Sequence, residues 1–376
     1  MSDYMKELYA LPNQFIDAWK AQGKKVVGTV CCHIPEELIY AADVLPIRIR
    51  ATGCTDDTEA ALWMSSFSCS FARGCLEQMS NGALDFMDGV IFSDGCDMIH
   101  RIYDNWDYND KSQKFRHQFY APRIVHENAP QYFKEDVELL KDALEKWTGN
   151  KITEEKLANA IRIYNESRTL MNRLYELRKQ PNPPVSGEDC LQWTLASMSM
   201  PKDIFNKLLG GFLARIGQVP PVTGKRARLV WCGGPVDEPS YLKIFEDAGA
   251  LIVNDFQCYG RARNIDLIPA PKAGETWLDT MTETYLNRPV CPRMCTQHKE
   301  IQDIIIDMVK EYNADGVIYA WIKNCEVWGA ELPRMKTRFE EEGIPMLGIE
   351  REQFQSNAGQ VGIRIEAFLE MLEGRK

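Results

Sequence analysis

The sequence predicts an α/β protein with two domains of parallel β-sheet, related by internal duplication, and a helical region inserted between them. Apolar β-branched runs alternate with amphipathic helical segments toward both ends of the chain, which is the pattern of doubly wound sheets. The phrase Asp-Gly-Val-Ile occurs at residues 88–91 and again at 315–318, each time shortly before a cysteine. We therefore expect an N-terminal α/β domain over residues 1–130, a helical region over 131–218 and a C-terminal α/β domain over 219–376.

The N-terminal domain begins with apolar residues at helical spacing, which predict a leading helix over residues 4–22. A short β-branched run then predicts a first strand, and Pro35 stands in the favoured first turn of the following helix. The other elements expected in this domain are a strand in 45–52, a helix over 71–80, a strand in 86–93 and a strand around 117–126.

Two charged segments with helical periodicity follow, at residues 132–149 and 152–179, and a Pro-rich break separates them from two further helices that end near Ile216. The first pattern then recurs. Residues 224–256 repeat the order of residues 23–49: a basic start, a strand, a cysteine, a proline, a helix and a second strand. A last strand, within GIPMLGIER, and a C-terminal helix complete the expected second domain.

Composition limits the classes of function. A content of 45% hydrophobic and 26% charged residues is that of an ordinary globular protein, and the net charge of -10 argues against a nucleic-acid surface. The N-terminus lacks the basic start and apolar core of a signal peptide, and no run approaches the 18 apolar residues of a membrane span. We expect a cytoplasmic protein that binds neither nucleic acid nor a membrane.

Three of the twelve cysteines stand where a strand or strand-like segment is expected to end: Cys69, Cys96 and Cys325. Disulfides are rare in a reducing compartment, so metal ligation or catalysis is favoured. Open α/β sheets place their ligand crevice at the carboxyl ends of the strands, and thiolates suit iron–sulfur clusters. Three ligands would leave one iron open to a substrate. The alternative is three unrelated core cysteines.

Other cysteines give weaker signals. The CxxxCxxH spacing of Cys291, Cys295 and His298 could bind zinc or add ligands, but an ordinary loop explains it equally well. Cys258 lies just past a strand end. Cys31 and Cys32 end the first strand, where side chains alternate, so at most one of them is expected to face the crevice. Small buried roles are expected for the remaining cysteines singled out, namely Cys54, Cys190 and Cys232.

Glu37, near His33 and Glu36, is the candidate for proton transfer beside a substrate. Its alternative role is that of an acidic partner of the helix dipole. Arg261 and Arg263 could meet a phosphate or carboxylate, or form surface salt bridges. No P-loop, no GxGxxG after a strand and no GxSxG elbow occurs, so neither P-loop ATP hydrolysis nor nicotinamide binding is expected.

Beyond these motifs, nearly the whole chain resembles the 2-hydroxyacyl-CoA dehydratase and benzoyl-CoA reductase family, including the D-component of 2-hydroxyglutaryl-CoA dehydratase. The resemblance is carried by blocks in the family's order: PEELIYAADVLPIRI, SFSCSFARGCLE, DGVIFSDGCDMIHRIYDNW, NDFQCYGRAR, ADGVIYAWIKNCEVWGAELP and EEEGIPMLGIEREQ.

This resemblance implies Rossmann- or flavodoxin-like domains and a heterodimer with a homologous second subunit. It also implies a 4Fe-4S cluster held by three cysteines, which on this chain are Cys69, Cys96 and Cys325. A separate ATP-dependent iron–sulfur activator would deliver one electron, which passes to the carbonyl of an acyl-CoA thioester. The resulting ketyl radical of an (R)-2-hydroxyacyl-CoA would lose its hydroxyl group to give an enoyl-CoA, and the electron would return.

Two departures from the family pattern leave the branch open. The segment NRPVCPRMCTQHKE is rich in cysteine, and CEVWGAE replaces the commoner Cys-Asp-Pro run. The alternatives are a benzoyl-CoA reductase-type subunit that reduces an aromatic ring, and a double-cubane-cluster reductase. A further alternative, from another class of function, is a cluster-free scaffold subunit that shapes the acyl-CoA site while its partner carries the metal.

Overall fold

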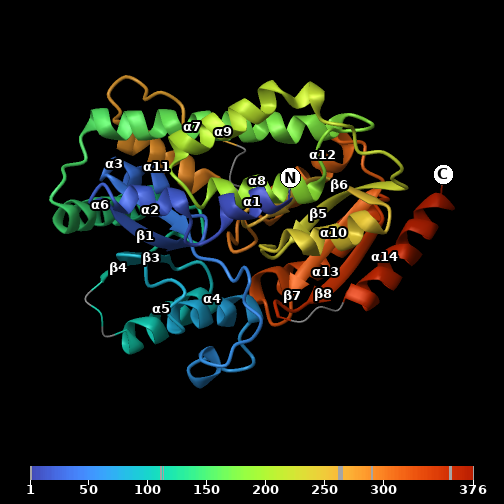
Figure 1. The fold of residues 1–376 in the computed structure, drawn as a ribbon, viewed down its shortest axis with the longest axis horizontal. Coiled ribbons are helices and arrows are strands. Elements are labelled where there is room, and N and C mark those ends of the chain that lie inside the picture. Colours follow the sequence, from blue (N-terminus) through green and yellow to red (C-terminus); the bar gives the residue numbers. More distant parts are fainter. Residues whose placement is uncertain are drawn as a thin grey trace.

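The computed structural model describes residues 2–110, 112, 114–260, 266–288, 291–354 and 358–375. It contains two four-stranded sheets, and every strand pair is parallel. The first sheet has the order β2-β1-β3-β4 and the second β6-β5-β7-β8, and they lie side by side (Figure 1). The predicted α/β class with two Rossmann- or flavodoxin-like sheets is confirmed.

The strands of the first sheet are β1 (Lys25–Val30), β2 (Val44–Arg48), β3 (Gly89–Ser93) and β4 (Phe115–Phe119). The strands of the second sheet are β5 (Ala227–Gly233), β6 (Ala250–Gln257), β7 (Gly316–Ile322) and β8 (Met346–Arg351). Because β5 to β8 repeat the strand order of β1 to β4, the two sheets have the same topology, as duplication of one unit would produce.

The repeated Asp-Gly-Val-Ile phrase has the same structural role in both sheets. The carboxylates of Asp88 and Asp315 each accept a backbone N–H at the start of the neighbouring strand, from Val26 and Arg228, both at 2.8 Å. The glycine that follows each aspartate lies against the chain entering the next strand. A Cβ on Gly89 would come within 2.7 Å of a carbonyl oxygen there, and the second glycine has the same constraint. The role of this phrase is therefore to fix how the strands pair, and not to supply a catalytic group.

Helices of the first half are α1 (Ser2–Tyr9), α2 (Gln14–Lys20), α3 (Glu36–Ala41), the short η1 (Ala60–Leu62), α4 (Ser70–Ser80) and α5 (Asp97–Asn109). The single leading helix expected over 4–22 is thus two helices. The second begins after Asn13, whose side-chain oxygen accepts the amides of Phe15 and Ile16 and so caps it.

The middle of the chain is helical, as expected. Its elements are α6 (Ala129–Thr148), α7 (Glu154–Glu176), η2 (Leu177–Lys179), α8 (Gly187–Ser197), α9 (Lys202–Ala214) and η3 (Ile216–Gln218). Helix α7 crosses above both sheets (Figure 1). In its C-terminal half Arg168 forms an ion pair with Glu37, and near its end Tyr175 donates a hydrogen bond of 2.7 Å to Asp255. This helix therefore connects the two α/β halves.

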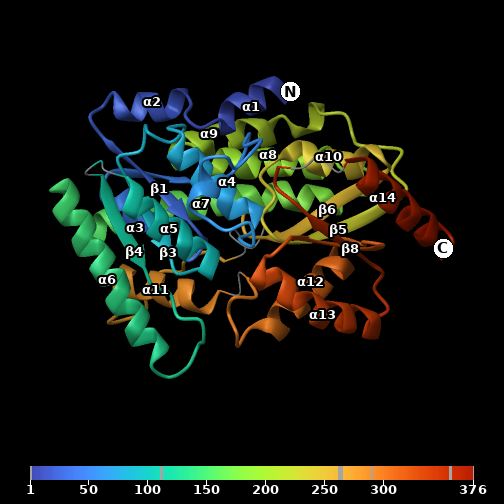
Figure 2. The same cartoon turned by 90° about the horizontal axis from the view of Figure 1, so that it is seen from below.

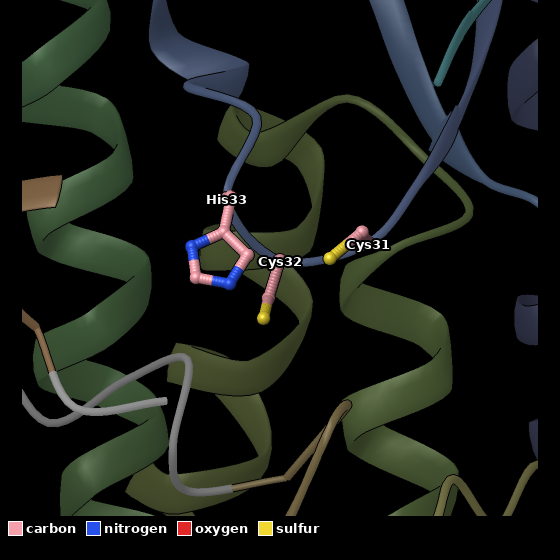
Figure 3. A group of neighbouring side chains, drawn as sticks. All are labelled: Cys31, Cys32 and His33. Atoms are coloured by element: carbon pink, nitrogen blue, oxygen red, sulfur yellow. The ribbon is translucent and has the colours of Figure 1, made fainter. Parts of the chain in front are cut away.

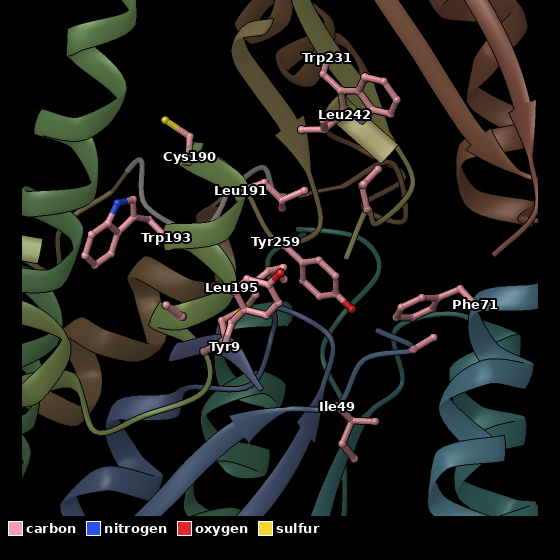
Figure 4. Packing of buried hydrophobic residues seen from close by; sticks show 14 of the residues in the cluster. Tyr9, Ile49, Phe71, Cys190, Leu191, Trp193, Leu195, Trp231, Leu242 and Tyr259 are labelled. Carbon is pink, nitrogen blue, oxygen red and sulfur yellow. The ribbon is translucent and has the colours of Figure 1, made fainter. Parts of the chain in front are cut away.

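The C-terminal half adds α10 (Pro239–Asp247), α11 (Trp277–Asn287), α12 (His298–Glu311), α13 (Glu326–Glu341) and α14 (Ala358–Glu373). One hydrophobic core runs between the halves, with α8 at its centre (Figure 4). Tyr9, Leu195 and Tyr259 belong to this core, and the rings of Phe71 and Tyr259 pack edge to face with centroids 6.2 Å apart. Within the described part of the chain, no helix combines the length and apolarity needed to cross a membrane.

Candidate metal centre

A buried cavity lies between the two sheets, which approach each other as Figure 2 shows from below. The empty space inside it, including the part open to solvent, is about 750 Å³. The lining comes from the carboxyl ends of strands of both sheets and from the segments that follow β1, β2, β3, β5, β6 and β7, so it occupies the edge where parallel sheets place their ligands. Seven of the twelve cysteines line it: Cys31, Cys32, Cys69, Cys96, Cys258, Cys291 and Cys325.

The three cysteines selected from the sequence all reach this cavity, and each occupies the same local position. Cys69, Cys96 and Cys325 are the N-cap residues of α4, α5 and α13. The backbone amide three residues further on faces each sulfur and lowers the pKa of its thiol. A helix N-terminus favours negative charge, so each of these positions is suited to a thiolate.

Burial works against that preference in the metal-free chain. It raises the pKa of Cys69 to about 12, with the charge of Cys325 as the next cause. Burial likewise raises the pKa of Cys96 well above its ordinary value, and the charges of Cys69 and Cys325 add to this effect. The three sulfurs are therefore close enough to repel one another as thiolates. A bound cation or cluster would remove that repulsion and displace the protons.

The turn after β1 brings two further thiols to the cavity. The expectation that at most one of Cys31 and Cys32 faces the crevice is wrong. The strand ends at Val30, and Cys31 has a left-handed backbone with φ of 82°, so the alternation of strand side chains does not extend to this pair. Cys31, Cys32 and His33 each offer a ligand atom within 4.8 Å of the others (Figure 3).

Thiol–thiol contacts connect this turn to the remaining cavity cysteines. The pKa of Cys32 is raised, and the largest cause is a hydrogen bond with the Cys291 thiol. Burial raises the pKa of Cys258 well above its ordinary value, and the charges of Cys32 and Cys31 raise it further. The Nε2 atom of His33 is buried and has no hydrogen-bond partner, and burial lowers the pKa of this imidazole well below its usual value. Its neutral form is the one that can bind a metal.

The CxxxCxxH segment does not assemble a zinc site within the described residues. Cys291 lines the cavity, whereas Cys295 is exposed and is not among the lining residues. His298 instead lies 2.8 Å from the carboxylate of Glu331, which is buried. Arg261 and Arg263, the candidates for phosphate or carboxylate binding, lie outside the described residues. Cys190 and Cys232 are buried core residues and Cys54 is half-buried, and none of the three lines the cavity.

Glu37 is fully buried and does not line the cavity. Its carboxylate accepts hydrogen bonds from Arg168 and, at 2.7 Å, from the Tyr285 hydroxyl. Glu36, in contrast, lines a smaller polar pocket behind Cys32 and also forms an ion pair of 3.1 Å with Arg48. Proton transfer by Glu37 stays a prediction. The smaller pocket is lined by its neighbour Glu36 and not by Glu37.

The donor set fits an iron–sulfur cluster. Apart from Arg48 and the thiols themselves, the lining is dominated by apolar and aromatic side chains, including Ile49, Phe71, Ile99, Ile322, Val327 and Trp328. No carboxylate lines the cavity among the described residues, so hard oxygen-seeking cations find no ligands there. Soft thiolates in a dry, apolar surrounding are the ligands of iron–sulfur centres.

The fold and this cavity define a class: an α/β protein with two parallel sheets of the same topology and a thiol-lined cavity between them. A family model described as 2-hydroxyglutaryl-CoA dehydratase, D-component, matches residues 31–372. The chain therefore belongs to this family, and the resemblance found in the sequence is confirmed.

Individual relatives span almost the whole chain. The (R)-phenyllactyl-CoA dehydratase beta subunit of Clostridium sporogenes is 28% identical over 98% of this chain and 97% of its own length. The lactoyl-CoA dehydratase subunit beta of Anaerotignum propionicum is 27% identical over the same shares. A subunit of the benzoyl-CoA reductase of Thauera aromatica is 25% identical over 91% of this chain and 89% of its own length.

Proposed function

We propose that the chain is the iron–sulfur subunit of an ATP-activator-dependent 2-hydroxyacyl-CoA dehydratase, which converts an (R)-2-hydroxyacyl-CoA into an enoyl-CoA. The observation that carries this proposal is the convergence of Cys69, Cys96 and Cys325, three helix N-caps from both halves, on one dry cavity. The names of the dehydratase relatives, which are beta subunits, support the substrate class and a homologous partner subunit.

In this proposal a 4Fe-4S cluster supplies one-electron reduction of the thioester, and the chain supplies its environment. Cys69, Cys96 and Cys325 hold three positions through their cap geometry. The apolar wall, with Phe71 and Trp328, keeps water from the reacting groups. The polar pocket lined by Glu36, behind Cys32, offers groups that could hold or move a proton.

Anaerobic purification tests the proposal. We expect a brown protein with about four irons per chain, given one cubane, and a complete loss of iron in Cys96→Ala. Dehydration of a 2-hydroxyacyl-CoA should require the partner subunit, ATP and the activator, with electrons needed only in catalytic amounts. A colourless chain that binds its partner or an acyl-CoA without iron would instead establish the cluster-free scaffold.

A second candidate, a double-cubane-cluster reductase of the same family, is favoured by one specific observation. Four further thiols, those of Cys31, Cys32, Cys258 and Cys291, line the same cavity and exceed what a single cubane with three ligands requires. The cavity thus offers more soft ligands than polar side chains that could orient a thioester.

Iron content and electron stoichiometry separate the two candidates. A double cubane gives about eight irons per chain, and Cys258→Ser should then remove about half of them. A single cubane held by Cys69, Cys96 and Cys325 keeps about four irons in the same variant. Cys295→Ser is the matched control, because this exposed thiol does not line the cavity. A reductase of either type consumes electrons in proportion to product.

A further inference from the structure

Several buried arginines lie near the thiol cavity, and one of them, Arg48, lines it. Arg48, Arg288, Arg293 and Arg351 are at most 5% exposed, although arginine is almost never fully buried unless it is paired. Arg48 has a carboxylate partner in Glu36. Arg293 and Arg351 are different, because their strongest hydrogen bonds go to uncharged backbone carbonyls.

Arg351 ends strand β8, beside the strand that leads to Cys325. Its register partner on β7 is Ile322, which lines the cavity. Its guanidinium donates to the carbonyl of Pro235, another lining residue, and its Nε atom is buried without a partner. Among the described residues, no carboxylate oxygen lies within 4.0 Å of it. Burial lowers the pKa of Arg351, and the charges of Tyr241, Asp237 and Cys325, in that order, oppose this.

Arg293 approaches from the opposite half of the site. Its two terminal nitrogens donate to the carbonyls of Ala121, at 2.6 Å, and Pro122, at 3.1 Å. Its Nε atom is also buried without a partner. The nearest carboxylate, Asp94, is 3.9 Å away and already pairs with Arg123 at 2.9 Å. The charge of Arg293 lowers the pKa of the Cys31 thiol.

The carboxylates near these two guanidiniums offset their charge only in part, because Asp94 is shared between Arg293 and Arg123 and the charge of Asp237 acts on Arg351 from beyond 4.0 Å. The cavity itself holds no carboxylate among the described residues, and its own groups are thiols. Thiolates bound to a cluster would add negative charge beside both arginines. We propose that Arg351 and Arg293 are positioning residues whose fixed positive charges stabilise the anionic, reduced form of the bound cluster and so set its reduction potential.

This inference rests on the proposed function, because it concerns the same centre. Its physical basis is that a nearby cation stabilises whichever redox state is more negative. Reduction adds one negative charge to the cluster, so removing the cation should make reduction harder. The effect is strong in a cavity with apolar walls, where the effective dielectric constant is low.

The experiment compares wild-type, Arg351→Met and Arg351→Lys chains, purified anaerobically with their iron. Midpoint potentials are measured by mediated redox titration, and iron per chain is counted in each sample. We expect Arg351→Met to keep its iron but to shift the oxidised-to-reduced ratio at a fixed potential about tenfold toward the oxidised form, which corresponds to about 59 mV for one electron. Arg351→Lys keeps the charge and should remain close to wild type.

Arg50→Met is the matched control. Arg50 is 1% exposed and, like Arg351, is held by uncharged acceptors, namely the carbonyls of Leu195 and Tyr9 and the Ser199 hydroxyl. Its charge is not among the groups that shift the pKa of Cys31, Cys96 or Cys325, whereas Arg351 interacts with Cys325 and Arg293 with Cys31. Substitution of Arg50 should lower stability without moving the potential. Should Arg351→Met fail to fold, Arg293→Met gives an independent measurement with the same expected sign.

An unchanged potential in an iron-loaded Arg351→Met or Arg293→Met chain overturns the inference and leaves the proposed function intact. An equal shift in Arg50→Met overturns it as well, because the shift would then reflect a general loss of packing. A wild-type chain without iron overturns the proposed function, and this inference with it.

Discussion

The turn at Cys31 is the single-residue feature on which the shape of the cavity depends. Its left-handed backbone ends β1 and brings both Cys31 and Cys32 to the cavity wall. Gly95 makes room for this turn, because a Cβ there would lie 2.8 Å from the Cys31 sulfur and 3.3 Å from a methyl carbon of Ile99. The Asp-Gly-Cys sequence before α5 is thus required by contact with the first strand's end.

Gly95→Ala should lower the free energy of unfolding by about 1–3 kcal/mol, because the added methyl overpacks the Cys31 sulfur. Urea unfolding of the metal-free chain measures the effect. Gly211→Ala, in helix α9, is the control: its Cβ would meet nothing within 4 Å, so we expect stabilisation by about 0.5–1 kcal/mol. Equal effects of the two substitutions would contradict the steric explanation.

Glu37 provides a second test at this scale. Removing one partner of a buried ion pair leaves the other charge without compensation, at a cost of about 3–5 kcal/mol. Glu37→Leu should therefore destabilise the chain strongly by leaving Arg168 buried and unpaired, whereas Glu37→Leu combined with Arg168→Met should recover most of the loss. Both are measured by urea unfolding.

The activity of that double variant decides the role of Glu37. A stable double variant with full dehydratase activity would show that Glu37 only supports the structure. Loss of activity with retained stability, iron and partner binding would support proton transfer.

Residues of the candidate site differ in how far the sequence predicts them. Cys69, Cys96 and Cys325 could be selected because each stands inside a short motif where a strand or strand-like segment is expected to end. The presence of both Cys31 and Cys32 at the cavity could not, because it depends on one backbone angle. Arg293 and Arg351 gave no signal, because nothing in a sequence distinguishes a buried arginine from a surface one.

Among the helices and strands, too, some could be predicted from the sequence and others could not. The duplicated phrase predicted equivalent strands, and the two sheets do share one order. Helix α5, which follows Cys96, was not anticipated, and the leading segment forms two helices because Asn13 starts a new one. The strand expected around 117–126 ends at Phe119, shortly before Pro122. Local capping and proline positions decide such boundaries.

Helix α6 contains a carboxyl group that should make stability depend on pH. Asp136 accepts the backbone N–H of Tyr120 at 2.8 Å, and burial raises its pKa to about 6 from an ordinary value of 3.8. Between these pH values the folded chain keeps a proton that the unfolded chain has lost. The stability that the protonated carboxyl contributes therefore falls as the pH rises from about 4 to about 6.

Asp136→Asn should remove this dependence. We expect it to raise the free energy of unfolding at pH 7 by up to about 2 kcal/mol and to have almost no effect at pH 4, because the amide mimics the protonated acid. Urea unfolding at the two pH values checks the prediction. Asp142→Asn, on the same helix, is the control, and a benefit at pH 7 that persists at pH 4 would contradict the explanation.

For the whole molecule, the decisive fact is that the two halves share one cavity. Its proposed ligands come from β2–α4 and β3–α5 segments of the first half and from the β7–α13 segment of the second. A cluster bound there would connect the halves in addition to helix α7. The duplication alone did not reveal that the sheets meet at this edge, because the meeting depends on packing through α8 and the long central helix.

Iron removal should therefore loosen the molecule between its halves. A ligand at a thousand times its dissociation constant stabilises a fold by about 4 kcal/mol, so we expect chelation to lower Tm by about 5 °C or more. Hydrogen exchange should increase at the first turns of α4, α5 and α13, while the middle of α7 stays protected. Uniform exchange changes over the whole chain would contradict a local role of the centre.

The division of ligands between the halves also sets an order of events during biosynthesis. The ribosome adds about 5–20 residues per second, so Cys325 follows Cys96 by roughly 10–50 s. Throughout that interval the growing chain carries Cys69 and Cys96 while their proposed third partner is missing. In the proposed function, insertion of a complete cluster is therefore a late step that follows synthesis of the second sheet.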